Sequence, residues 1–85
     1  MVAVFSHHAE EQLIFRGLTR EMVYFVLENP LQETFVDNLW VYDGIILEDN
    51  KQYLLRIFIN REKEPPVIVT VYKTSKIRKY YESDL

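Results

Sequence analysis

The sequence predicts an α+β fold in which two N-terminal helices pack on a three- to four-stranded antiparallel sheet, followed by a short C-terminal helix. Three observations support this prediction. Apolar residues recur at helical spacing within residues 7–29, strand-like patterns fill residues 34–72, and the connections between those patterns have hairpin length. Separate runs of helices and strands are typical of α+β folds, and short connections favour antiparallel pairing.

Two helices are expected from their end residues. Ser6 can cap the first helix, and Gly17 can adopt the left-handed conformation that ends many helices. Thr19 can cap the second helix, which ends at Pro30 because the residue before a proline avoids helical geometry. The residues of the second helix that should face the core are Met22, Val23, Val26 and Leu27.

The first strand patterns are short or interrupted. Residues 34–36 form a short strand, which a turn at 37–38 separates from residues 39–47. We interpret 39–47 either as one strand that is bent or bulged at Asp43-Gly44, or as a tight hairpin at those two residues. A further turn is expected at 48–51.

The later strand patterns are clearer. Residues 53–59 alternate between two faces, and residues 67–72 form the strand that is richest in β-branched side chains. Thr74 or Ser75 can cap a last helix over residues 76–81. With both N-terminal helices on one sheet face, we expect the other face to be at least partly open.

Size and composition predict a single small domain, residues 1–85. A chain of this length buries only about 60 % of its unfolded surface, so the margin of stability is thin. The core must come from the 48 % hydrophobic residues, because the sequence has no cysteine for a disulfide or a thiolate–metal site. The absence of cysteine also fits a reducing compartment. Without a signal peptide or an apolar run of membrane-spanning length, we expect a soluble cytoplasmic protein.

The net charge of −3 conceals an uneven distribution. Residues 1–50 carry nine acidic and two basic side chains, whereas residues 51–85 carry four acidic and eight basic ones. Either the surface is bipolar, with one end that attracts anions, or the charges are uneven by chance.

Arg56 and His8 are candidates for chemistry. Arg56 lies within an apolar strand pattern, where it either binds phosphate on the open sheet face or is an ordinary strand arginine, exposed or paired with Glu48. His8 shares one helix face with Gln12 and Phe15, and acts either as a general base or acid or as a structural residue. The adjacent histidines point apart and lack a third ligand, so we expect no metal, and we expect no cofactor.

The C-terminal segment 70–81 concentrates cations and aromatic rings. Its rings could stack on nucleic-acid bases, its cations could bind phosphate, and Ser75 with the following amides could hold an anion. The alternative is a short amphipathic helix that docks Ile77 and Tyr80 while its cations stay in water. The cations and rings are Lys73, Lys76, Arg78, Lys79, Tyr72, Tyr80 and Tyr81.

Segments covering nearly the whole chain resemble a small domain family of unknown function. "HAEEQLIFRGL" followed by "TREMVYFVLENP" resembles its opening, and "YLLRIFI" and "VIVTVYKTSKIRKYY" resemble its later strands and its Thr-x-Tyr-x-Thr-Ser-Lys close. The family is grouped by analogy of fold with the RelE/ParE-like toxins of bacterial toxin–antitoxin modules, near BrnT. A departure is Gln12, where members often carry arginine.

The resemblance implies two helices packed on an antiparallel sheet and, for many relatives, endoribonuclease activity without a metal. In that reaction the ribose 2′-hydroxyl attacks the adjacent phosphate, which needs a base, an acid and nearby cations. The expected catalytic residues are His8, Arg56, Tyr72 and Lys76. The residues expected to bind nucleic acid are Arg16, Lys73, Ser75, Arg78 and Lys79.

Two functions follow as hypotheses. The first is a toxin-like endoribonuclease whose partners are RNA and an antitoxin-like protein. The alternative is a non-catalytic module of the same fold that recognises a protein or nucleic acid. A lone housekeeping protein without an antitoxin is a further hypothesis. No contact with a membrane is expected, and an exposed sheet edge would also allow a homodimer.

Overall fold

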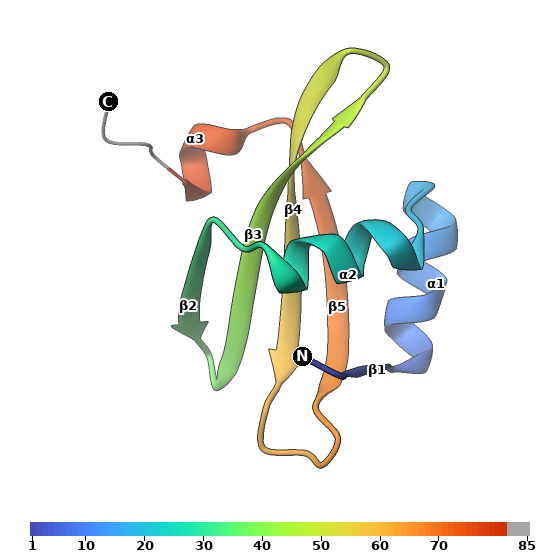
Figure 1. Cartoon of the computed structure of the whole chain (residues 1–85), viewed down its shortest axis with the longest axis vertical. Helices are drawn as coiled ribbons and strands as arrows, with labels where there is room; N and C mark the ends of the chain where they lie inside the picture. Colours follow the sequence, from blue (N-terminus) through green and yellow to red (C-terminus); the bar gives the residue numbers. More distant parts are fainter. Residues whose placement is uncertain (82–85) are drawn as a thin grey trace.

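The computed structural model describes residues 1–81 and is an α+β fold with one mixed five-stranded sheet (Figure 1). The strands are arranged in the order β1-β5-β4-β3-β2, with β1 parallel to β5 and all other neighbours antiparallel. The elements are β1 (Val4–Phe5), α1 (His7–Arg16), α2 (Arg20–Glu28), β2 (Gln32–Val36), β3 (Leu39–Glu48), β4 (Lys51–Asn60), β5 (Val67–Thr74) and α3 (Ile77–Tyr80).

The ends of both N-terminal helices are as predicted. The Ser6 hydroxyl accepts a hydrogen bond from the Ala9 amide at 3.0 Å, which caps α1. Gly17 ends α1 with a φ of 64°, in the left-handed region where glycine has no Cβ penalty. Thr19 caps α2 by accepting from the Met22 amide at 3.2 Å. These local signals therefore define the two helices.

The two predicted turns are confirmed as tight hairpin turns. Asp37 and Asn38 connect β2 to β3 with φ values of 50° and 67°. Asp49 and Asn50 connect β3 to β4 with φ values of 51° and 63°. Positive φ at both central residues matches the twist of antiparallel strands, and asparagine and aspartate tolerate it better than most residues.

Residues 39–47 belong to one strand, as in the first of the two interpretations, whereas a bulge or a hairpin at Asp43-Gly44 is wrong because β3 pairs with β4 continuously through both residues. Asp43 pairs with Arg56 and Gly44 pairs with Leu55 in an uninterrupted register. A Cβ on Gly44 would lie 2.8 Å from a methyl carbon of Val26. Glycine is thus present because α2 packs closely on the strand at this point, and it does not mark a turn.

The predicted three or four antiparallel strands are also corrected, since the sheet has five and one pairing is parallel. The added strand β1 consists of two residues, which pair with Val67 and Ile68 of β5. A two-residue strand has no periodic pattern in the sequence. It forms because the outer edge of β5 is available to pair with it.

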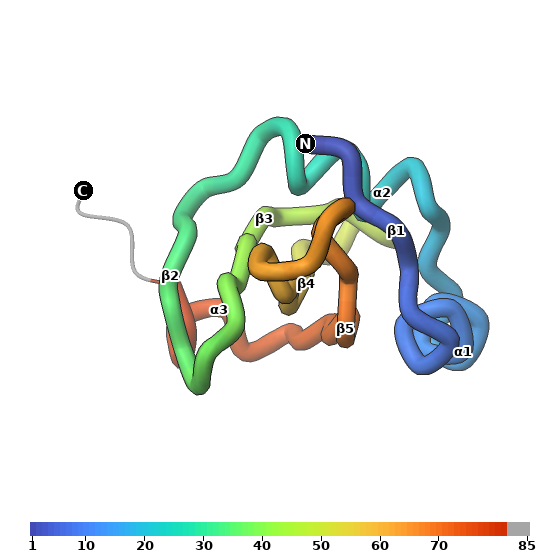
Figure 2. The backbone as a smooth tube through the Cα atoms, turned by 90° about the horizontal axis from the view of Figure 1, so that it is seen from below, coloured from blue at the N-terminus to red at the C-terminus, as the bar shows by residue number. Residues whose placement is uncertain are grey.

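The two N-terminal helices do not pack on the sheet in the same way, which corrects the prediction that both cover one face. Helix α2 crosses the sheet over β3 and β4, whereas α1 lies beside β5 at the edge of the sheet, as Figures 1 and 2 show. Both helices contribute to one core with the facing side chains of the strands. The fully buried residues of that core are Ala9, Val23, Val26, Leu55, Ile57, Ile59, Ile68 and Val71.

The sheet face opposite α2, called the second face here, is partly covered by α3. The short C-terminal helix was predicted, but its cap was not: Lys76 occupies the cap position without a side-chain hydrogen bond. The Thr74 hydroxyl instead accepts from the Lys76 amide at 3.0 Å. Among residues 1–81, no helix is long and apolar enough to cross a bilayer.

Candidate nucleic-acid interface

A buried ion pair occupies the centre of the second face. The Arg56 Nε donates to Oδ1 of Asp43 at 2.9 Å, across the β3–β4 pairing. The Asp43 side chain is fully buried, and that of Arg56 is only 14 % exposed. An unpaired carboxylate at such a position would carry a large desolvation cost, and Arg56 offsets that cost by neutralising the buried charge.

Gln32 provides the second hydrogen-bond partner of the Asp43 carboxylate and connects it to α3. Its side-chain amide donates to Oδ2 of Asp43 at 2.6 Å and to the Tyr80 carbonyl at 2.9 Å. Both carboxylate oxygens therefore have a partner, and the end of α3 is held against the sheet.

Two aromatic rings lie between two arginines on the second face. The guanidinium carbon of Arg56 lies 4.1 Å from the centre of the Tyr80 ring, and that ring meets Tyr72 edge-on at 6.3 Å. The guanidinium of Arg16 lies over the other ring, 5.1 Å from the centre of Tyr72. We call Arg16, Tyr72, Tyr80 and Arg56 the cation–aromatic row. It combines α1, β4, β5 and α3 into one surface.

Gln12 fixes the position of Arg16 in this row. Its side-chain carbonyl accepts from the Arg16 Nε at 2.9 Å, one helical turn away. Gln12 thus orients the neighbouring arginine through a hydrogen bond.

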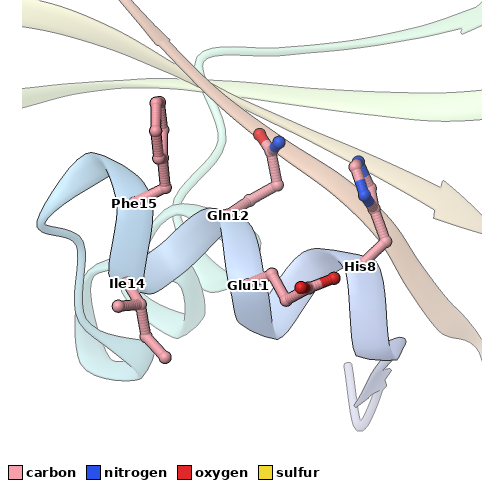
Figure 3. A pocket seen from close by; sticks show the side chains of 5 residues that line it. All are labelled: His8, Glu11, Gln12, Ile14 and Phe15. Carbon is pink, nitrogen blue, oxygen red and sulfur yellow. The ribbon is translucent and has the colours of Figure 1, made fainter.

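His8 lies on the exposed surface of α1, away from the ion pair. Figure 3 shows His8, Gln12 and Phe15 pointing to the same side of the helix, as their spacing predicted. With Glu11 and Ile14 they line an open hollow of about 500 Å³. His8 precedes Arg16 by two turns, which is about 12 Å along the helix axis.

Lys73 lies on the opposite face of β5 from Tyr72. Its ammonium group binds the Glu48 carboxylate at 3.0 Å and lies 3.4 Å from the Arg16 carbonyl. The Tyr53 ring lies on the same side, at 4.9 Å. The partner of Glu48 is therefore Lys73, whereas Arg56 takes Asp43.

The remaining predicted residues lie in α3 or directly before it. Ser75, Lys76, Arg78 and Lys79 are all exposed, and the Lys79 ammonium lies 5.4 Å from the centre of the Tyr80 ring. Together with the row they add positive charge along one border of the second face. The structure thus brings Arg16, Arg56 and Tyr72 together and leaves His8 and Lys73 outside the row.

Sequence reasoning missed Asp43 and Gln32. Asp43 was assigned to a bend or turn because it precedes glycine, and Gln32 lay before the predicted start of its strand. The available signal was an acidic residue within one apolar strand pattern and a basic residue, Arg56, within the next. Buried charges of opposite sign in adjacent strands indicate a pair.

The acidic and histidine side chains of residues 1–81 form no group of three or more that could hold a metal ion. Comparison of the chain with protein-family models, curated proteins and solved structures gives no match.

Proposed function

We propose that this protein is a RelE/ParE-like toxin-type domain that binds single-stranded RNA along the cation–aromatic row. The observation that carries the proposal is the stacking of Arg16 on Tyr72 beside that of Arg56 on Tyr80. Proteins that bind single strands combine cations for the backbone with rings on which bases stack. The exposed cations of α3 extend the positive surface next to these rings.

Arg56 retains the capacity to contact a phosphate. Its Nε donates to Asp43, but its two terminal nitrogens form no hydrogen bond with other residues within 1–81. A guanidinium can present two such donors to phosphate oxygens in parallel. Because Asp43 balances its charge, Arg56 would orient the phosphate more than attract it, and attraction would come from Arg16 and Lys76.

The reaction we propose is the one that the resemblance implies, attack of a ribose 2′-hydroxyl on the adjacent phosphate without a metal. His8 is the candidate base or acid, and Tyr72 is a second proton donor or a stacking platform. General acid–base catalysis needs these groups within hydrogen-bond reach of the reacting atoms. A strand that extends from the row along α1 would bring a phosphodiester to His8.

A second candidate function is binding without cleavage, to RNA or to a protein. Two observations favour it. His8 is exposed and makes no hydrogen bond with residues 1–81 that would orient its imidazole, and the charge of Arg56 is balanced by Asp43. An antitoxin-like protein is the partner that the first candidate function requires.

Anisotropy of a labelled single-stranded RNA tests the binding face. Arg16→Ala should weaken binding by about 10-fold or more. It should also make the slope of log affinity against log salt concentration shallower by roughly 0.7, because one cation no longer neutralises a phosphate. The matched control is Arg61→Ala, because Arg61 also stacks on a ring, that of Trp40 at 4.5 Å, but lies outside the row. An equal loss of affinity in both variants would mean that only total charge matters.

Gln12→Ala separates orientation from charge. It removes the partner of Arg16 without changing the net charge, so a several-fold loss of RNA affinity is expected, with Gln52→Ala on β4 as the control of the same residue type.

Cleavage in the presence of a chelator separates the two candidate functions. The toxin-type function predicts cut RNA and slowed growth of an expressing host, both relieved by His8→Ala while RNA binding persists. Binding without any cut product supports the second candidate. If RNA does not bind at all, RNA is eliminated as the target.

A further inference from the structure

A groove between α2 and β3 lies outside the cation–aromatic row. It has a volume of about 470 Å³ and is open to solvent. Two large apolar side chains on its walls are mostly exposed, Phe25 at 60 % and Leu47 at 65 %. Its lining residues are Glu21, Met22, Phe25, Ile45, Ile46 and Leu47. Contiguous exposed apolar surface beside a polar border is typical of a binding site.

The border of this groove is acidic. Glu21, Tyr24, Phe25 and Glu28 are all exposed and recur at i, i+3, i+4 and i+7, so they form one outward stripe of α2. Neither Glu21 nor Glu28 takes part in an ion pair within residues 1–81. The stripe therefore presents two aromatic rings between two carboxylates without a cationic partner.

Cations on neighbouring segments do not neutralise this border. Arg20 donates to Glu10 at 2.7 Å, and Lys73 binds Glu48. Lys51, at the end of the β3–β4 hairpin, lies 5.4 Å from the centre of the Tyr53 ring. A phosphate backbone would be repelled here, which separates this surface from the one proposed for RNA.

We propose that the groove docks a segment of a protein partner that carries apolar anchor residues flanked by lysine or arginine. The anchors would fill the space between Phe25 and Leu47, and the cations would meet Glu21 and Glu28. Arginine would gain further from the face of Phe25, because guanidinium groups stack favourably on aromatic rings. This proposal does not depend on RNA binding and can fail or hold independently of it.

A random peptide library displayed on phage tests the chemistry of the partner. Selection on the whole protein should enrich peptides in which Lys or Arg flank Leu, Ile, Val or aromatic residues. An enriched peptide, made synthetically, should bind the double variant Glu21→Lys/Glu28→Lys at least 10-fold more weakly than the unaltered protein. Circular dichroism verifies that the variants are folded, as expected for substitutions at exposed positions.

The matched control is Glu62→Lys/Glu64→Lys, which makes the same change in charge in the exposed β4–β5 loop. Equal weakening by both double variants would overturn the proposal, since any negative surface would then suffice. Enrichment of acidic or neutral peptides, or no enrichment, would overturn it as well. If sedimentation shows self-association that Phe25→Ala abolishes, the occupant is a second copy of this chain and the proposed partner is wrong.

Discussion

Asp43 and Arg56 lie directly opposite each other on β3 and β4, and their side chains form an ion pair of 2.9 Å in which the aspartate is fully buried. Arg56 in turn lies against the Tyr80 ring of α3. The arginine that the sequence suggests for catalysis thus also has a structural task, since it compensates a buried charge and supports the surface that we assign to RNA.

Removal of one partner of this pair should strongly destabilise the folded protein. We expect Asp43→Ala to lower the free energy of unfolding by about 3–5 kcal/mol, because it leaves a poorly solvated guanidinium without its counter-ion. Urea denaturation measures this loss. The control is Arg20→Ala, whose ion pair with Glu10 is about half exposed and should therefore contribute much less to stability. Similar losses in the two variants would contradict a buried pair.

Gly44 should not tolerate a methyl group. In Gly44→Ala the new Cβ would meet both methyl carbons of Val26, at 2.8 and 2.9 Å, which should cost about 1–3 kcal/mol. The double variant Gly44→Ala/Val26→Ala should lose less than the sum of the single variants, because the smaller side chain removes the clash. A double-mutant cycle in urea measures this coupling, and strict additivity would show that the two residues do not touch.

Gln32 should determine how firmly α3 is docked. Its amide bridges Asp43 and the Tyr80 carbonyl, so Gln32→Ala should release the end of α3 and speed tryptic cleavage after Arg78 and Lys79. Mass spectrometry of the early fragments measures the effect, with Gln52→Ala as the control. An unchanged cleavage rate at these two sites would mean that the stacking on Tyr80 is sufficient to hold the helix.

Tyr42 should make the protein sensitive to alkaline pH. Burial raises the pKa of Tyr42 above its ordinary value of 10.0. The folded state then holds its proton more tightly than the unfolded state. The stabilising contribution is therefore complete below about pH 10 and is lost as the pH rises towards the folded-state pKa. Unfolding in urea at increasing pH should show a smaller alkaline loss in Tyr42→Phe than in the unaltered protein, and identical profiles would contradict this.

The bounds of the two N-terminal helices and of the two turns could be predicted because their signals are local. Ser6, Gly17 and Thr19 act within a few residues of their own positions, as do Asp37-Asn38 and Asp49-Asn50 in the turns. Such signals need no knowledge of the rest of the chain. The error at Asp43-Gly44 has the opposite origin, because the same pair of residues that suits a turn also suits a strand when a helix packs on the glycine.

The candidate site could be predicted in composition but not in arrangement. The concentration of cations and rings in the last segment is visible in the sequence, yet it does not reveal that Lys73 binds Glu48 on the neighbouring part of the sheet. Nor does it indicate that Arg16, at the end of α1, completes the row across the edge of the sheet.

The sequence by itself determined the order of the elements after β1, the ends of α1 and α2 and the two tight turns, because capping and turn chemistry act between near neighbours. The tertiary structure alone decided the parallel strand β1, the position of α1 beside β5, the pairing of Asp43 with Arg56 and the stacking of Arg16 on Tyr72. The physical reason is that each of these depends on burial and on contacts between segments that are distant in the chain.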